Sequence, residues 1–262
     1  MAKKLVNTIP PQPVKASVAG AQTGGRALKL LKILAEHKEP ISLTEMAEKA
    51  QLDISATHRM MRELEANAFA EREPDGKRYV VGGELISLAS TVLSKIDMRG
   101  SARPILEKLV SSTGETVTLK LRDGLRRITI DGVESKHAVR RVVSFGDGLP
   151  LYSTPSGWAI LAFLTETEIQ TSFKAAEEQG VSIAKARKAL SGIRKDGYLI
   201  STTKDRGQGH CVLTAPIFST RGVVGAIAIS GPPERWNAEA AAKHVTELLQ
   251  ACKYLSASLG HR

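Results

Sequence analysis

Apolar residues recur at steps of three and four along the first third of the chain, which is the spacing of helices that bury one face. Such a helix is predicted over Arg26–His37, and Pro40 prevents it from continuing. A second helix is predicted over Thr44–Ala50, because Ser42 and Glu45 have the spacing of a capping box. The folded part of the chain is therefore expected to begin with two short helices.

A third helix is predicted within Leu52–Asn67, with Asp53 or Ser55 as its N-cap. The spacing gives it one inward face, made of Thr57, Met60, Met61, Leu64 and Ala68. The opposite side carries Ser55, Arg59, Arg62 and, at its margin, His58. Free N–H groups at a helix start suit a phosphate, and arginine suits a phosphate or a guanine edge. Two helices joined by a tight turn, the second with exposed arginine, form the pattern of a helix-turn-helix.

A β-hairpin is predicted directly after the third helix. Pro74-Asp75-Gly76 is a turn signal between the alternating segments Phe69–Glu73 and Lys77–Val81. A hairpin in this position is a wing, which can lay basic residues along DNA. We therefore predict a winged helix-turn-helix domain over 26–82 that binds double-stranded DNA; the alternative is a winged helix used for protein contacts. The predicted DNA-contact residues are Arg26, Ser42, Thr44, Ser55, Thr57, His58, Arg59, Arg62, Lys77 and Arg78.

Two connecting segments flank this domain. Residues 1–25 contain three prolines and little apolar content, which predicts a flexible N-terminal arm. Residues 83–99 are predicted to form a linker helix whose apolar seam is Leu85, Leu88, Ala89, Val92 and Ile96. The seam can pack against a twin helix in a homodimer or against its own chain, and the pattern leaves both open. A dimer would place two recognition helices about 34 Å apart on one DNA face.

From residue 100 the pattern changes to strands mixed with helices. Helices are predicted at Ala102–Ser112, within Leu151–Leu164, and at Glu166–Gln179, Ile183–Lys195 and Ala238–Leu259. Strands are predicted on both sides of Asp123-Gly124 and at Ala138–Ser144, Tyr198–Thr203, Cys211–Phe218 and Val223–Ile229. This mixture predicts an α+β domain over 100–262, with one sheet flanked by helices and enough residues for its own core.

Composition narrows the function classes further. The net charge of +10 over 262 residues suggests nucleic acid, but residues 26–82 hold ten Lys/Arg against ten Asp/Glu. Only the local placement of arginine therefore supports DNA binding. Two cysteines, Cys211 and Cys252, give no disulfide framework and fit a reducing compartment. The sequence has no apolar run near the roughly 20 residues of a membrane span and no signal-peptide core, so a cytoplasmic protein without a membrane partner is expected.

Five segments in order resemble the IclR family of bacterial transcriptional regulators, and the resemblance covers about Arg26 to Gly260. The segments are S-A-T-H-R-M-M at Ser55–Met61, E-T-V-T-L at Glu115–Leu119, L-P-L-Y-S-T-P-S-G-W-A at Leu149–Ala159, G-H-C-V-L-T-A-P-I-F at Gly209–Phe218 and A-I-A-I-S-G-P at Ala226–Pro232. The resemblance implies a winged helix, a linker helix and a C-terminal GAF/PAS-like effector-binding domain. It also implies dimers that assemble into tetramers on DNA and control operons for catabolism of small organic or aromatic acids.

The resemblance also implies where an effector binds. Family members hold it at the helix start after L-P-L-x-(A/S)-T, which here gives Thr154, Ser156 and Gly157. Free N–H groups at a helix start hold a carboxylate well, and glycine permits close approach to the backbone. The other implied positions are Ser201, Thr202, Val212, Ala228 and Ser230.

The implied pocket departs from the pattern of members that bind short keto acids. Among the implied positions beyond the helix start, only Ser230 keeps the residue of those members, and Trp158 replaces their usual lysine. A more apolar pocket, and hence a bulkier, aromatic carboxylate, is therefore expected. By alternation along a strand, one of His210 and Cys211 faces the pocket and the other faces away.

Enzyme functions receive little support. The six histidines show no metal-ligand spacing, no G-x-S-x-G surrounds a serine, and Gly207-Gln208-Gly209 lacks the third glycine of a nucleotide fingerprint. Neither a metal nor another cofactor is expected. A hydrolase that uses Ser156 as nucleophile and His210 as base remains a formal alternative, as does a small-molecule-binding protein whose winged helix serves protein contacts.

Overall fold

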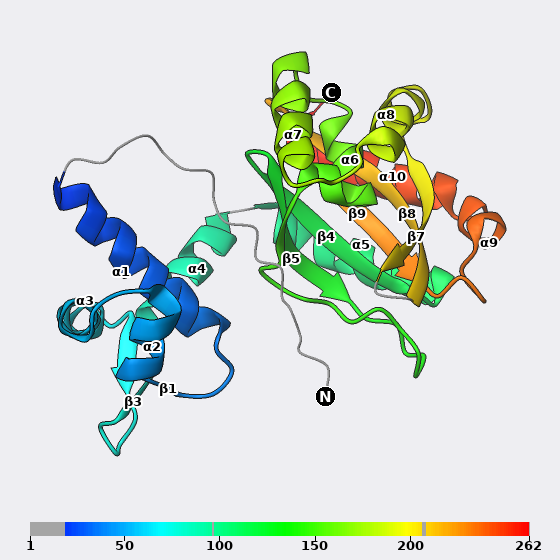
Figure 1. Cartoon of the computed structure of the whole chain (residues 1–262). Helices are drawn as coiled ribbons and strands as arrows, with labels where there is room; N and C mark the ends of the chain where they lie inside the picture. The colour runs from blue at the N-terminus through cyan, green and yellow to red at the C-terminus, as the bar shows by residue number, and fades with distance from the viewer. Residues whose placement is uncertain (1–18, 96, 206–207, 262) are drawn as a thin grey trace. The chain divides into compact units, whose positions relative to one another are not determined.

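The computed structural model describes residues 19–95, 97–205 and 208–261 (Figure 1). The chain divides into two compact units, Met1–Leu93 and Ser94–Arg262. The described part of the first unit contains α1 (Ala19–Glu36), β1 (Ile41–Ser42), α2 (Leu43–Ala50), α3 (Ile54–Ala66), β2 (Ala70–Arg72), β3 (Arg78–Val81) and the start of α4 (Gly83–Lys95).

The first unit is a winged helix, as predicted. Its strands pair antiparallel in the order β1-β3-β2, so the wing hairpin is joined by a two-residue strand that the sequence pattern did not predict. Its core is almost entirely aliphatic and comes from all three helices and the sheet: Leu30, Leu34, Ile41, Met46, Ala50, Ala56, Met60, Met61, Ala70 and Tyr79. Gly82 follows the second strand of the wing. Only glycine fits there, because a Cβ would lie 2.1 Å from the Ala68 carbonyl oxygen.

Three predictions about the first unit are corrected. Helix α1 begins at Ala19, so residues 19–25 are helical and not part of a flexible arm; the remainder of that arm, residues 1–18, lies outside the described residues. Gly24 and Gly25 each weaken a helix by about 1 kcal/mol, which does not end this one. The spacing of apolar residues in the first helix also predicts that Leu28 broadens its inward face, but Leu28 is 60% exposed. Ala68 lies beyond the end of α3, exposed and with a φ of 57°.

The second unit contains one six-stranded antiparallel sheet in the order β6-β5-β4-β9-β8-β7. Its strands are β4 (Thr116–Asp123), β5 (Arg126–Val133), β6 (Gly148–Pro150), β7 (Leu199–Asp205), β8 (Gln208–Ser219) and β9 (Gly222–Gly231). Its helices are α5 (Asp97–Thr113), the 3-10 turn η1 (Leu151–Ser153), α6 (Pro155–Leu161), α7 (Glu166–Glu178), α8 (Ala184–Asp196), α9 (Ala238–Ala242) and α10 (Val245–Ser258). The α+β prediction is confirmed.

The two faces of this sheet differ in chemistry. Helices α5 and α10 pack on one face and α6 on the other, where α6 also contacts α8 (Figure 1). Because side chains alternate along a strand, Val117 and Leu119 of β4 share one face and Thr118 and Lys120 the other. Val117 and Leu119 are 0% exposed and belong to the aliphatic core. The face toward α6 is thus polar at the middle of the sheet.

Residues 134–147 form an irregular segment, where a strand had been predicted at Ala138–Ser144. Side chains occupy the backbone groups that a strand would use. Arg235 donates to the carbonyl of Val139 (2.6 Å), and Thr116 Oγ1 donates to that of Arg141 (2.7 Å). The predicted C-terminal helix is also divided, since α9 ends at Ala242 and α10 begins at Val245. Strand β6 lies directly before Leu151, where the sequence pattern predicts a loop over F-G-D-G-L-P.

Candidate DNA-binding surface and effector cavity

Helix α3 presents a polar outer face. Asp53 is its N-cap, with its carboxylate accepting from the Ala56 N–H at 2.7 Å, which resolves the choice between Asp53 and Ser55. Exposed positions on the helix include Ser55, His58, Arg59 and Arg62. These four side chains are therefore available to a groove of DNA, and their role in contacting it stays a prediction.

Thr57 must be removed from the direct-contact set. Its side chain is 0% exposed and its hydroxyl donates to the Asp53 carbonyl at 2.9 Å. The periodicity that placed Thr57 on the inward face was right, and a residue on that face cannot also reach a base. Thr57 instead stabilises the first turn of α3.

The start of α2 and the wing carry the other predicted contacts. The Ser42 hydroxyl donates to the Glu45 carboxylate at 2.7 Å and accepts from the Glu45 N–H at 3.3 Å, so it serves the capping box. Thr44, Lys77 and Arg78 are exposed. A basic wing tip beside an exposed helix is the arrangement expected for contacts with the DNA backbone.

A groove of about 520 Å³ lies between α1 and α3. Three arginines line it, Arg26 from α1 and Arg59 and Arg62 from α3, over a floor of Ala56 and Met60. Glu63 is the single carboxylate among its described lining residues. The surface around the outer face of α3 is therefore basic although residues 26–82 are neutral in sum.

In the second unit, a cavity of about 410 Å³ lies between the polar face of the sheet, the start of α6 and the segment 134–147. Strands β4, β5, β8 and β9 supply its floor, and Val142, Val143 and Ser144 part of its wall. Such a volume suits a small organic molecule. The groups that line it determine which one.

Lys120 is the most unusual group in this cavity. Its side chain points from the middle of β4, is 9% exposed, and donates from Nζ to Thr129 Oγ1 at 2.7 Å. Burial, aided by the charge of Arg127, lowers the pKa of Lys120 to about 7. The ammonium is therefore held in an environment that disfavours its charge.

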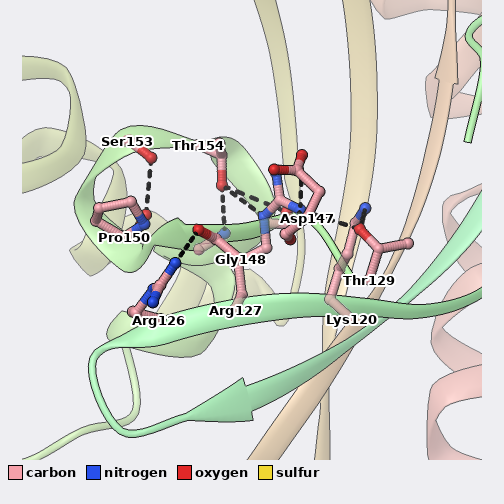
Figure 2. Close-up of polar contacts among 11 residues, drawn as sticks. Lys120, Arg126, Arg127, Thr129, Asp147, Gly148, Pro150, Ser153 and Thr154 are labelled. Carbon is pink, nitrogen blue, oxygen red and sulfur yellow. Dashed lines mark hydrogen bonds and ion pairs between the residues drawn. The ribbon is translucent and has the colours of Figure 1, made fainter. Parts of the chain in front are cut away.

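Arg127 lies beside it on β5 and is 6% exposed (Figure 2). Its guanidinium donates to Thr129 Oγ1 (3.2 Å), to the Asp147 carbonyl (3.4 Å) and to Thr154 Oγ1 (3.5 Å). The Asp147 carboxylate is 4.0 Å away and 42% exposed. Burial lowers the pKa of Arg127, an effect that Asp147 opposes. Two buried cations thus share one neutral hydroxyl and one distant carboxylate.

The structure gathers six of the predicted effector residues around this cavity. They are Thr154, Ser156, His210, Val212, Ala228 and Ser230. His210 is therefore the neighbour that faces the cavity, while Cys211 is 0% exposed on the opposite side of β8. Whether these six residues bind an effector stays a prediction.

Other predicted effector residues lie elsewhere. Thr202 pairs with Cys211 across β7 and β8, which places it on the sheet face away from the cavity. Ser201 pairs with Val212 on the cavity side but is not among the lining residues. Trp158 does not line the cavity either; its indole N–H donates to the Tyr152 carbonyl at 2.6 Å. The apolar contribution expected from Trp158 is therefore absent.

Gly157 has a packing role and is not among the residues that line the cavity. A Cβ at this position would lie 2.2 Å from the Leu151 carbonyl oxygen, so only glycine lets α6 fold against η1. Its N–H is bonded to Thr154 Oγ1 at 3.2 Å, and Pro155 has no N–H. Two of the first three helical positions thus offer no donor to an anion. The buried cations replace the helix start as the principal anion-attracting feature.

Sequence reasoning missed Lys120 and Arg127, although one signal for Lys120 was present. In T-V-T-L-K-L, strict alternation places Lys120 with Thr118 and opposite Val117 and Leu119. Burying a charged lysine without a polar partner is costly, so a lysine in the middle of a strand that is buried on both faces predicts a polar site on its side of the sheet. Arg127 had the same kind of signal on β5, where R-I-T-I places Arg127 with Thr129 and opposite Ile128 and Ile130.

Within the described part of the chain, no group of three or more His, Cys, Asp or Glu side chains has the arrangement of a metal site. No helix among these residues is long and apolar enough to cross a bilayer.

Two family models match the chain. The model for the IclR helix-turn-helix domain matches residues 25–74, and the model for the bacterial transcriptional regulator IclR C-terminal domain matches residues 90–257. The transcriptional repressor IclR of Escherichia coli K12 is 28% identical over 264 residues, covering 94% of this chain and 95% of that protein.

Solved structures agree with these matches. The IclR protein of Thermotoga maritima is 31% identical, with a TM-score of 0.69 over 92% of this chain and 99% of its own. An IclR homologue from Microbacterium hydrocarbonoxydans, solved with 4-hydroxybenzoate, shares the fold with a TM-score of 0.76 at 18% identity, over 92% of this chain and 100% of its own. The winged helix, the six-stranded α+β domain and both family matches lead to one conclusion: this chain belongs to the IclR family of bacterial transcriptional regulators.

Proposed function

We propose that this regulator binds operator DNA through α3 and the wing. We also propose that a small organic acid, bound in the cavity of the second unit, controls the affinity for that DNA. The single observation that carries the effector proposal is the pair of buried cations, Lys120 and Arg127. Burying like charges without full compensation destabilises a fold. A carboxylate placed between them supplies the missing compensation.

Apolar side chains in the cavity walls indicate that the acid has an organic skeleton. Val142, Val143, Leu149, Val212 and Ala228 provide apolar contacts around the polar floor. The relative solved with 4-hydroxybenzoate supports an aromatic acid as one candidate, and an aliphatic acid of similar size is equally compatible with a 410 Å³ cavity. Ser156, His210 and Ser230 supply hydrogen-bonding groups that would orient either.

The proposed assembly is a homodimer, with pairs of dimers on DNA. Helix α4 leaves Leu88, a residue of the predicted seam, 45% exposed in the single chain, and a twin helix would cover it. The side chain of Val92, and Ile96 as a whole, lie outside the described residues. Two copies of α3 on one DNA face would then meet successive major grooves.

Control follows from linkage, since an effector shifts DNA affinity only if it binds the DNA-competent and incompetent arrangements unequally. A tenfold change in operator affinity needs about 1.4 kcal/mol of such difference. We place the connection in α4, which joins the two units in sequence.

The test is fluorescence anisotropy with the full chain, the DNA upstream of its own gene, and a scrambled duplex of equal length, at low salt. We expect preferential binding of the upstream DNA and a shift of that affinity by an organic acid that also raises the melting temperature. Equal binding to both duplexes with every acid would contradict the proposal.

A further inference from the structure

We infer that Lys120 binds the effector covalently, as a reversible imine with an aldehyde or ketone carbonyl that lies beside the carboxylate of the acid. This inference rests on the proposed function and narrows its ligand class from organic acids in general to those that carry such a carbonyl. In this assignment Lys120 Nζ bonds to the carbonyl carbon, and Arg127 holds the carboxylate. The position of the amine, the guanidinium beside it and the space around both support this assignment.

The amine of Lys120 is placed as a nucleophile on the floor of the cavity. Lys120 lines the cavity from the middle of β4 and is 9% exposed, so a molecule has to enter the cavity to reach it. Nζ donates to the neutral hydroxyl oxygen of Thr129 at 2.7 Å. An uncharged amine can keep that hydrogen bond and still present its lone pair to a ligand. A lysine paired with a carboxylate would instead be held as an ammonium, which has no lone pair.

The environment of Lys120 makes the neutral amine available near neutral pH. Burial lowers the pKa of Lys120 to about 7, and the charge of Arg127 adds to this effect. A lysine at its ordinary pKa of 10.5 is almost wholly protonated under these conditions. Desolvation and a neighbouring cation are the means by which proteins activate lysine for imine formation with carbonyl compounds. Both are present at Lys120.

Arg127 is the second group of the site, and its closeness to Lys120 limits the shape of the ligand (Figure 2). Arg127 Nη1 donates to the same Thr129 oxygen at 3.2 Å, so the two nitrogens cannot lie further apart than these two hydrogen bonds placed end to end. Among the described residues, the hydrogen bonds of Arg127 use Nε and Nη1, so Nη2 is available to a carboxylate. An acid whose carbonyl carbon is bonded to its carboxyl carbon fits this separation.

The rest of the cavity accommodates the skeleton of such an acid. Its volume of about 410 Å³ suits a small organic molecule, and Val212 and Ala228 offer apolar contacts. Lys120 and Arg127 are 9% and 6% exposed, so an imine formed between them would have limited contact with bulk water. Exclusion of water protects a reactive intermediate from hydrolysis. The site can therefore hold an imine for longer than a lysine on the surface.

The reaction is balanced without any further reagent. The lone pair of the neutral Lys120 amine attacks the carbonyl carbon and forms an N–C bond, while the π electrons of the carbonyl move to its oxygen. Both hydrogens of the amine end on that oxygen, which leaves as water, and the nitrogen lone pair forms the C=N double bond. Nothing is oxidised or reduced. Addition of water reverses the sequence and releases the acid, as a reversible effector requires.

The experiment traps the imine by reduction in the full chain. The chain is incubated at pH 7 with phenylglyoxylate or phenylpyruvate and sodium cyanoborohydride, which converts an imine into a stable secondary amine. Mandelate and phenyllactate, in which a hydroxyl replaces the carbonyl, are the matched acids and should give no adduct. We expect each oxo acid to add its mass less one oxygen atom. Peptide mass spectrometry should map the adduct to Lys120, in about tenfold or higher yield than at any other lysine.

A charge-preserving variant separates capture from electrostatic attraction. In calorimetry without reductant, the unmodified chain should bind phenylglyoxylate about tenfold or more tightly than mandelate. Lys120→Arg keeps the positive charge but lacks the amine, and it should reduce this preference to about threefold or less. The matched control is Lys185→Arg, the same exchange at the other lysine among the described lining residues, and it should keep both the adduct and the preference. Thermal unfolding verifies the fold of each variant, and labelling of the unmodified chain tests the inference without them.

The outcomes separate the inference from the proposed function. Equal binding of oxo acids and hydroxy acids, with no adduct at Lys120, would overturn covalent capture and leave an acid effector in place. An adduct spread evenly over Lys120, Lys185 and other lysines would overturn it as well, because the cavity would then confer no selectivity. If no acid of either kind binds or labels the chain, the proposed effector function fails and the inference fails with it.

Discussion

At the scale of single residues, Lys120 has the clearest energetic signature. A lysine 9% exposed on a strand loses hydration that one hydroxyl does not restore. We expect Lys120→Met to raise the free energy of unfolding by about 1–4 kcal/mol in urea titration, because an uncompensated buried charge is replaced by a side chain of similar volume. The same variant should lose acid binding. A less stable Lys120→Met protein would contradict this account.

The pKa of Lys120 sets the direction of pH effects. Between about pH 7 and its ordinary value of 10.5, the unfolded chain binds this proton and the folded chain does not. The Lys120 penalty is therefore complete below pH 7 and relieved as pH rises through that window, so the free energy of unfolding should rise with pH relative to Lys120→Met. Matched urea titrations at pH 6.5 and 9 measure the difference, and identical pH profiles would refute it.

Acid binding should have the opposite dependence on pH. A bound carboxylate favours the ammonium, so the complex takes up a proton above pH 7 and affinity falls by up to about tenfold per pH unit. Titration calorimetry between pH 6 and 9 measures this. A Lys120→Arg variant, which stays charged, serves as the control and should bind with little pH dependence. A flat profile in the unmodified chain would exclude Lys120 from the binding step.

The outer face of α3 yields a paired prediction. Arg59→Ala should weaken specific operator binding by about 1–3 kcal/mol, measured by anisotropy. Thr57→Val, which removes a buried hydroxyl bonded to Asp53, should lower stability and leave the preference for operator over scrambled DNA unchanged. If Arg59→Ala weakens both duplexes equally, Arg59 contacts phosphate rather than a base.

Sequence reasoning succeeded where neighbours along one element decide a residue's position. It placed Ser55, Arg59 and Arg62 outward because helical spacing is local. It failed at Arg127, whose burial depends on Asp147 and Thr154, 20 and 27 residues away. It also missed that contact with Leu151 requires a glycine at position 157. Such contacts arise only after folding.

At the scale of elements, segment 134–147 is where the alternation of polar and apolar residues wrongly predicted a strand. V-R-R-V-V-S resembles a strand, yet its backbone is held by side chains from elsewhere. Glu134 accepts from the Val143 N–H at 3.0 Å and from Arg140 at 2.8 Å. Arg235 joins the same segment to buried Glu115. Residues 139–144 are thereby ordered as a wall of the cavity although they form no strand of the sheet.

Loosening this wall should weaken acid binding. Glu134→Ala removes two hydrogen bonds that order residues 140–143, and re-ordering them on binding should cost about threefold to tenfold in affinity by calorimetry. Glu239→Ala, a change of equal charge at an exposed position on α9, should bind like the unmodified chain. Equal affinities in both variants would show that the wall is ordered without Glu134.

The winged helix, by contrast, followed from local signals. The Ser42–Glu45 capping box, the Asp53 cap and the Pro74-Asp75-Gly76 turn each act within a few residues, and all three mark element boundaries. The two-residue strand β1 was not predicted, because its pairing with β3 spans more than thirty residues.

At the scale of the whole molecule, charge is distributed by function rather than uniformly. The net charge of +10 gives no guide to the proposed DNA-binding surface, since the winged helix is neutral in sum and three of its five arginines line one groove. In the second unit, Lys120 and Arg127 place part of the positive charge inside a cavity. Bulk composition could not separate these two uses, and element placement does.

Self-association is the remaining property at this scale. Leu88 is 45% exposed on α4, so Leu88→Asp should leave the fold of the single chain intact while opposing a helix–helix interface. We expect sedimentation velocity to show a shift from dimer toward monomer and operator affinity to fall at least tenfold. The control is Ser90→Asp, which adds the same charge at an exposed position on the same helix. A dimer unaltered by Leu88→Asp would place the interface elsewhere.

The alternation on β4 has an evolutionary consequence. Val117 and Leu119 belong to the buried interior, while Thr118 and Lys120, which alternate with them, line the cavity. If the cavity binds the effector as proposed, mutations at every second position of such strands would change which acid is recognised and would leave the hydrophobic interior untouched. Related regulators could then differ in effector specificity while keeping the same fold. The same positions are the ones to vary when building a biosensor for a chosen acid.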